Sequence, residues 1–126
     1  MRSVTSRLAL LLALPLLAAA CRHASPTRPA TLAAPVGSAL LLTGVVTENR
    51  HGCEVDISCE LMVDTGRETV AVIYHYGEGQ RCENAAVFDQ AWPLQRGDRV
   101  EVLAEVVAGR SLSLCDALRY YVRPLP

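Results

Sequence analysis

The stretch from Leu94 to Val106 reads LQRGDRVEVLAEV and carries the strongest secondary-structure signal in the chain. Gly97 and Asp98 favour a turn near its start. Beyond the turn, apolar side chains occupy every second position and the residues between them are mostly charged: Val100, Val102, Ala104 and Val106 alternate with Arg99, Glu101, Leu103 and Glu105. This alternation is typical of a strand with one buried face. The stretch therefore predicts a turn followed by a half-buried β-strand.

Segments on both sides of this stretch also predict strands. Four of them are rich in apolar and β-branched residues, at 40–47, 60–64, 69–76 and 111–115. Thr65 and Gly66 separate the second of these from the third and favour a hairpin. Residues 84–90 are short and polar and predict a helical turn or loop before the fourth strand, and residues 118–123 finish the chain. The sequence thus predicts an all-β domain of five strands with a break between the third and the fourth.

The first twenty residues have the three-part composition of an export signal. Basic Arg2 and Arg7 precede an apolar run at 8–17, and three alanines follow at 18–20. Such a pattern indicates a signal peptide that is removed from the mature protein. The apolar stretch at 8–20 is also shorter than the roughly 20 residues that a membrane-spanning helix needs. We therefore expect residues 1–20 to be a signal peptide and not a permanent membrane anchor.

Cys21 follows the signal directly, and two kinds of processing fit it. Ordinary signal peptidase would cut after Ala20 and leave Cys21 as a fifth, unpaired thiol in an oxidising compartment. The run Ala18-Ala19-Ala20-Cys21 resembles the bacterial lipobox, in which the cysteine is lipidated and becomes the first mature residue. This resemblance implies a periplasm-facing lipoprotein, anchored to a membrane of the cell envelope through Cys21. A soluble periplasmic or secreted protein is the alternative.

The residue after the lipidated cysteine bears on which membrane holds it. Arg22 is not the acidic residue that retains enteric-type lipoproteins in the inner membrane, so the outer membrane is the expected address. Residues 21–38 contain three prolines among Ala, Ser and Thr and predict a disordered linker. Residues 39–126 are then one small domain, whose size makes disulfides a useful supplement to a single core.

Three segments of this domain match a known fold. They are Gly44-Val45-Val46, the hairpin around Asp64-Thr65-Gly66, and the pattern Leu94-x-x-Gly97-Asp98-x-Val100-x-Val102. Together they resemble the OB-fold domains of exported bacterial lipoproteins, over nearly all of residues 39–123. The resemblance implies a small five-stranded Greek-key barrel. It implies a fold and not an activity, because one fold hosts many functions.

The cysteines of the domain are expected to form disulfides, as is usual in small exported proteins: Cys53, Cys59, Cys82 and Cys115. Four cysteines allow three pairings. We favour Cys53 with Cys59, which staples the first loop, and Cys82 with Cys115, because the resemblance places strands three and five side by side. The interval between Cys53 and Cys59 is longer than the C-x₂₋₄-C of structural zinc sites. We expect no metal and no cofactor.

The charge of the domain bears on its partner. Residues 39–126 contain eight arginines and thirteen carboxylates, a formal charge of 8 − 13 = −5. OB-folds often bind single-stranded nucleic acid or oligosaccharide through strands two and three. Nucleic-acid binding, however, depends on a positively charged groove. An envelope protein or glycan is therefore the expected partner, and single-stranded nucleic acid is the alternative, which the charge disfavours.

Tyr74 and Tyr76 are candidate ligand-contacting residues. Residues two apart on a strand face the same side, so the pair would form a small aromatic platform. Packing in the core is the favoured alternative, and His75 between them is interpreted as a structural histidine. The sequence has no G-x-S-x-G, H-E-x-x-H or phosphate-binding glycine motif. We expect a non-catalytic protein.

Overall fold

The computed structural model describes residues 34–55, 57–108 and 111–126. The predicted signal peptide, Cys21 and residues 22–33 of the predicted linker lie outside the described residues. Residues 34–38, also assigned to the linker by sequence, contain a turn in which the Ser38 N–H donates to the Pro35 carbonyl (3.1 Å). The Gly37 N–H donates to the Val106 carbonyl (2.7 Å), so this turn is attached to the barrel.

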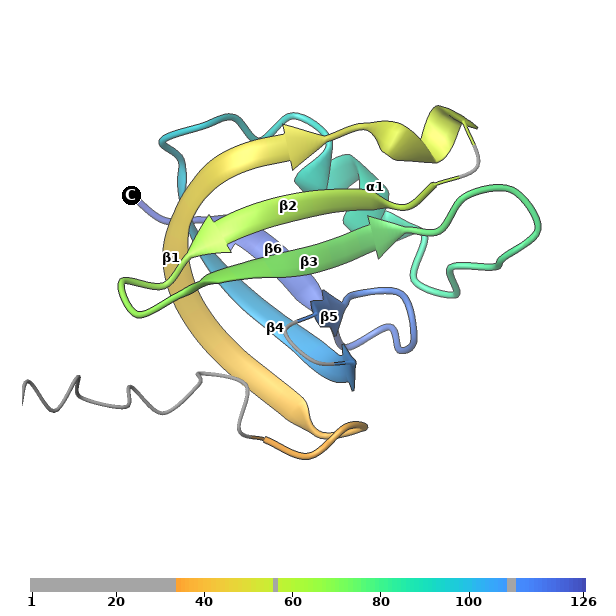
Figure 1. Cartoon of the computed structure of the whole chain (residues 1–126), viewed down its shortest axis with the longest axis horizontal. Coiled ribbons are helices and arrows are strands. Elements are labelled where there is room, and N and C mark those ends of the chain that lie inside the picture. Colours follow the sequence, from red (N-terminus) through yellow and green to blue (C-terminus); the bar gives the residue numbers. More distant parts are fainter. Residues whose placement is uncertain (1–33, 56, 109–110) are drawn as a thin grey trace, which may run out of the picture.

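The described chain folds into a β-barrel (Figure 1). In sequence order its elements are β1 (Ala39–Arg50), η1 (Gly52–Val55), β2 (Cys59–Asp64), β3 (Thr69–His75), α1 (Ala86–Ala91), β4 (Arg99–Ala108), β5 (Ser111–Ser113) and β6 (Tyr121–Pro124). The strand order is β1-β2-β3-β5-β4, and β1 closes the ring by pairing with β4 as well. β3 and β5 are parallel, and the other pairs are antiparallel. The predicted five-stranded OB-fold-like barrel is confirmed.

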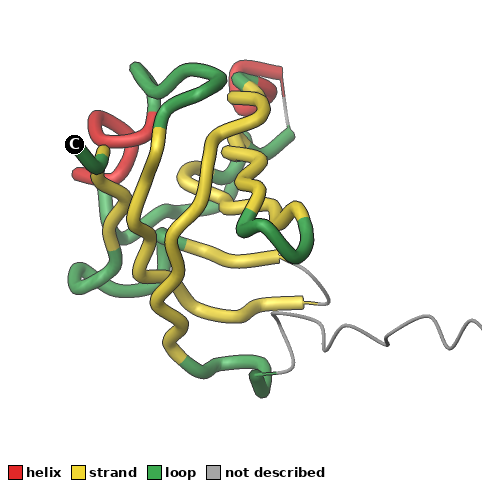
Figure 2. The backbone as a smooth tube through the Cα atoms, turned by 90° about the vertical axis from the view of Figure 1, so that its left-hand side faces the viewer, coloured by secondary structure: helices red, strands yellow, loops and turns green. Residues whose placement is uncertain are grey.

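The sixth strand was not predicted. β6 pairs with β4 beside β5, with Val122 opposite Val102 and Tyr121 opposite Leu103. α1 lies next to β6, near the C-terminus of the chain (Figure 2). The Gln90 side chain on α1 accepts a hydrogen bond from the Val122 N–H (3.2 Å). A four-residue strand has too few positions to show an alternation, and its partner is distant in sequence. Only the tertiary pairing defines it.

The core confirms the alternation expected in β4. The four apolar residues on one side of this strand are at most 1% exposed: Val100, Val102, Ala104 and Val106. β1 is long because its first half pairs with β4 and its second half with β2. Gly44 lies where β1 passes from one partner to the other. A Cβ at Gly44 would stand 2.5 Å from the Asp64 carbonyl oxygen, so only glycine allows this close approach.

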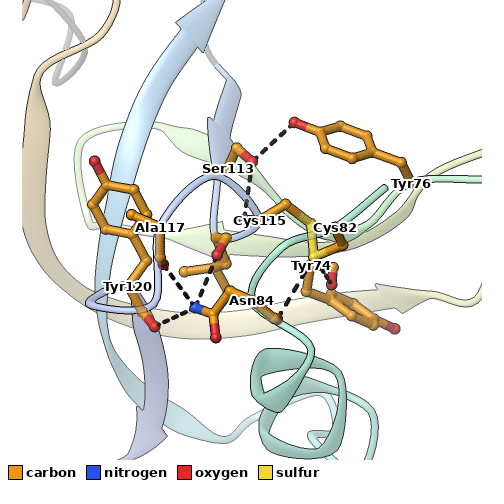
Figure 3. The surroundings of a disulfide bond; sticks show 9 residues. Tyr74, Tyr76, Cys82, Asn84, Ser113, Cys115, Ala117 and Tyr120 are labelled. Atoms are coloured by element: carbon orange, nitrogen blue, oxygen red, sulfur yellow. Dashed lines mark hydrogen bonds between the residues drawn. A yellow bond between two sulfur atoms is a disulfide. The ribbon is translucent and has the colours of Figure 1, made fainter. Parts of the chain in front are cut away.

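Two asparagines hold the chain on either side of α1. Asn84, which is 2% exposed, precedes the helix, and its amide nitrogen donates to the carbonyls of Leu114 (3.1 Å), Ala117 (3.0 Å) and Tyr120 (2.8 Å; Figure 3). Asn49 on β1 donates in the same way to the carbonyls of Ala91 (3.0 Å), Trp92 (3.2 Å) and Leu94 (2.9 Å). An amide group has only two N–H hydrogens, so in each asparagine one hydrogen is shared between two carbonyl oxygens. Each side chain thus satisfies carbonyls that no regular ladder reaches.

Both expected disulfides are present. Cys53 bonds to Cys59 across a sequence separation of 6, and Cys82 bonds to Cys115 across a separation of 33. The first closes the loop that contains η1. The second joins the segment after β3 to the segment after β5, where the parallel pairing of these strands brings the two segments together.

The two disulfides are expected to differ in their contribution to stability. Replacing Cys82 and Cys115 together by alanine should lower the unfolding free energy by about 4 kcal/mol, against about 2 kcal/mol for Cys53 and Cys59. The longer loop loses more unfolded-state entropy when it is cross-linked. Denaturant unfolding of the two double variants measures this order, and a larger loss for the Cys53/Cys59 variant would contradict it.

Asn84→Asp is expected to destabilise the protein by about 3 kcal/mol or more. The substitution keeps the shape of the side chain but places a carboxylate opposite three carbonyl oxygens. Chemical unfolding near neutral pH gives the change in free energy. Gln95→Glu makes the same amide-to-carboxylate change on an exposed side chain and should shift stability by no more than about 0.5 kcal/mol. Equal effects of the two substitutions would refute the role assigned to Asn84.

Candidate functional site

The outer side of β2 and β3 is an open surface with an apolar centre. Met62 on β2 lies opposite Ala71 on β3, and Glu60 lies opposite Ile73. These four residues, which we name the β2–β3 face, are each partly buried, whereas the alternating residues of the same strands are fully buried: Leu61, Val63, Val70 and Val72. In Figure 1 no helix or strand of the described chain lies in front of β2 and β3.

The border of the β2–β3 face is polar. Glu48 and Arg50 on β1 lie opposite Met62 and Glu60 and form an exposed ion pair with each other (3.0 Å). The Ser58 hydroxyl donates to the Glu60 carboxylate (3.3 Å). An apolar centre within a polar border is the arrangement found in protein–protein interfaces.

A pocket of about 250 Å³ lies at the end of β3. Its lining consists of one apolar side chain and several polar groups: Ser58, Ile73, Tyr76, Gly77, Glu78 and Gln80. The Tyr76 and Ser113 hydroxyl groups are hydrogen-bonded to each other (2.9 Å), and the Ser113 oxygen accepts from the Cys115 N–H (3.1 Å; Figure 3). Because Cys115 is disulfide-bonded to Cys82, one wall of the pocket is fixed to the frame of the barrel.

The structure separates the two tyrosines that were expected to share one side. Tyr74 is fully buried, and its hydroxyl donates to the Asn49 side chain (2.7 Å). Tyr76 lies beyond the end of β3, which stops at His75, and it lines the pocket. Residues two apart face the same side only within a continuous strand. Tyr76 lies after the last residue of β3, so the rule does not apply to it. Tyr74 is a core residue, as the packing interpretation had it, and Tyr76 remains the ligand-contacting candidate.

Aromatic side chains hold the first loop and α1 together. The rings of His51 and Trp92 are stacked at 3.9 Å, and those of Phe88 and Trp92 at 5.0 Å. His75 meets the Phe88 ring edge-on at 5.4 Å. These contacts agree with a structural interpretation of His75. No sequence pattern indicated the contact between His51 and Trp92, because the two residues lie in segments far apart in the chain.

A larger hollow, about 310 Å³, lies between α1 and β6. Its lining is Gln90, Tyr121, Val122, Arg123 and Pro124. The polar groups around it bond to one another: the Glu101 carboxylate accepts from the Tyr121 hydroxyl (2.7 Å) and pairs with Arg123 (2.6 Å). The Tyr121 hydrogen bond and the Arg123 charge lower the pKa of Glu101. This hollow therefore offers a ligand fewer uncommitted polar groups than the smaller pocket on β3.

Neither a metal centre nor a membrane-spanning helix occurs in the described part of the chain. No group of three or more His, Cys, Asp or Glu residues within 34–55, 57–108 and 111–126 is placed to hold a metal ion. No helix in the same residues is long and apolar enough to cross a membrane. Comparisons with protein-family models, curated proteins and solved structures give no match for this chain.

Sequence reasoning did not single out Met62, Ile73, Glu60 and Glu78. Neither strand alternates between polar and apolar residues along these positions. Leu61, Met62 and Val63 form a continuous apolar run, and both sides of β3 are apolar in sequence, with Val70 and Val72 on one side and Ala71 and Ile73 on the other. Which side faces solvent follows from how the barrel closes.

The burial of Tyr74 predicts a loss of stability at high pH. Burial raises the pKa of Tyr74 from 10.0 to about 12, so the folded state holds the proton at a pH where the unfolded state has lost it. The buried, protonated Tyr74 hydroxyl therefore contributes to stability below the pKa that tyrosine has in the unfolded state, and this contribution falls as pH rises toward the pKa of the folded state. Between about pH 9 and about pH 11, the unfolding free energy of the wild-type protein should fall by about 1 kcal/mol more than that of the Tyr74→Phe variant. Denaturant unfolding at both pH values tests this; the other tyrosines affect both proteins alike, and parallel curves would contradict it.

Proposed function

We propose that this protein is a non-catalytic binding or structural module of the bacterial cell envelope, lipidated on Cys21, whose barrel recognises a protein or glycan partner through the β2–β3 face. The observation that carries the proposal is the apolar centre at Met62, Ala71 and Ile73, which is partly exposed and in front of which no helix or strand of the described chain lies in Figure 1. The adjoining pocket supports it, because hydrogen bonds and a disulfide fix the pocket wall before any partner arrives. Because the pocket wall is already ordered, binding a partner costs less conformational entropy.

The charge around this face supports a partner other than nucleic acid. Glu48, Glu60 and Asp64 lie on the strands of the face or its border, and Arg50 is paired with Glu48. A strand of phosphates would be repelled by these carboxylates instead of releasing counterions to a basic groove. An electrophoretic shift assay with single-stranded DNA tests this, and no shift is expected. The assay is done at low salt, because added salt weakens nucleic-acid binding.

The proposal predicts that a charge in the centre of the β2–β3 face abolishes partner capture. The full-length protein, expressed in a bacterial host and extracted with detergent from the envelope fraction, is used as bait for envelope extracts. Ile73→Lys should reduce recovery of the captured partner at least about tenfold, because the apolar contact is lost and an ammonium group is desolvated. Recovery is measured by quantitative mass spectrometry.

Leu41→Lys is the matched control, since Leu41 is a 60% exposed apolar residue on the part of β1 that pairs with β4. It should leave capture unchanged. The intact mass of each bait verifies cleavage before Cys21, acylation and oxidation of the four remaining thiols. Equal capture by both variants, or a bait that retains Met1, would count against the proposal.

A further inference from the structure

The pocket at the end of β3 combines an apolar floor with hydrogen-bond acceptors. The Ile73 side chain supplies the apolar part, and the Tyr76 ring adjoins it. The Glu78 carboxylate and the oxygens of Ser58 and Gln80 supply the polar part. A lysine or arginine side chain has the complementary composition, an apolar stem that ends in a cationic group with several donors. Carboxylates and tyrosine rings are the groups that bind such cations.

The size of the pocket fits one side chain better than a separate ligand. Small-molecule sites in proteins usually measure about 300 to 1,000 Å³. This pocket measures about 250 Å³ and continues directly into the β2–β3 face through Ile73. A side chain that enters it can therefore belong to a segment that lies along the face and covers Met62 and Ala71.

The carboxylates next to the pocket are arranged to attract a cation. Glu78 lines the pocket itself, and Ser58, which also lines it, bonds to the Glu60 carboxylate, which places Glu60 beside the pocket. Arg50 is the cross-strand neighbour of Glu60, but its guanidinium pairs with Glu48. Within the domain, carboxylates also exceed arginines by thirteen to eight. Complementary charge of this kind selects partners and speeds their association.

From these observations we propose that the partner is a basic protein segment, which inserts a lysine or arginine side chain into the pocket that Glu78 lines and that Glu60 borders through Ser58. This inference rests on the proposed function and specifies the chemistry of the partner. It assigns the β2–β3 face to a cationic, partly apolar polypeptide and not to a glycan.

Peptide binding tests the inference. The probe is a fluorescein-labelled nonapeptide of alternating arginine and valine, and its twin carries citrulline, the neutral isostere of arginine, in place of each arginine. Fluorescence anisotropy with the detergent-solubilised full-length protein should show the arginine peptide binding at least tenfold more tightly. Raising the salt concentration should weaken its binding. Equal affinity for the two peptides, or displacement of the arginine peptide by a neutral oligosaccharide such as chitohexaose, would overturn the inference.

Variants distinguish a specific pocket from the general negative charge of the domain. Glu78→Gln and Glu60→Gln should each weaken arginine-peptide binding about five- to tenfold. Asp89→Asn removes an exposed carboxylate from α1, which lies behind β2 and β3 in Figure 1, and should leave binding unchanged. Thermal unfolding verifies that each variant is folded. Equal losses for all three variants would mean unspecific attraction and would refute the pocket.

The outcome for the pocket is separable from that for the proposed function. If the peptide experiments fail while Ile73→Lys still abolishes capture from envelope extracts, the β2–β3 face remains a binding surface and its partner is not basic. If Ile73→Lys leaves capture intact, both proposals fall.

Discussion

The parallel pairing of β3 with β5 is the contact on which the barrel depends. The other neighbouring strands pair antiparallel, but this closure joins segments far apart in the chain through three residue pairs: Ala71–Ser111, Val72–Leu112 and Ile73–Ser113. A ladder this short contributes few hydrogen bonds, and parallel pairs are slightly less stable per residue. Three additional contacts reinforce it, namely the Cys82–Cys115 disulfide, the Asn84 amide and the hydrogen bond between Tyr76 and Ser113.

The candidate binding pocket lies at this same junction. Ile73 contributes a residue pair to the closure through its backbone, and its side chain lines the pocket. Tyr76 likewise bonds to β5 through its hydroxyl while its side chain forms a wall. The groups that close the barrel therefore also fix the geometry of the pocket. A binding site built on such rigid elements loses little conformational freedom when a partner binds.

The sequence allowed prediction of those features that depend on local pattern. The alternation of apolar and charged residues in β4 correctly predicted its buried side. Thr65-Gly66 correctly predicted the hairpin between β2 and β3, where Gly66 has a φ of 85°. The pairing of Cys82 with Cys115 was favoured because the resemblance to an OB-fold places strands three and five side by side, and the structure confirms this disulfide. Three features did not follow, because each depends on contacts between distant segments: the strand β6, the separation of Tyr74 from Tyr76, and the exposed side of β3. The triple carbonyl contacts of Asn49 and Asn84 belong to the same class, since no neighbouring residue indicates them.

The two exposed sides of the barrel differ in how their charges are used. On the side formed by β4 and β6, Glu101 is held by Tyr121 and Arg123, and the resulting low pKa shows that its charge is already stabilised within the molecule. On the β2–β3 face, Glu60 accepts from the Ser58 hydroxyl, a neutral donor, and its cross-strand neighbour Arg50 pairs with Glu48. A carboxylate that has a neutral donor gains more from an incoming cation than one that is already in an ion pair. The difference favours the β2–β3 face as the surface on which a basic partner would add the most binding energy.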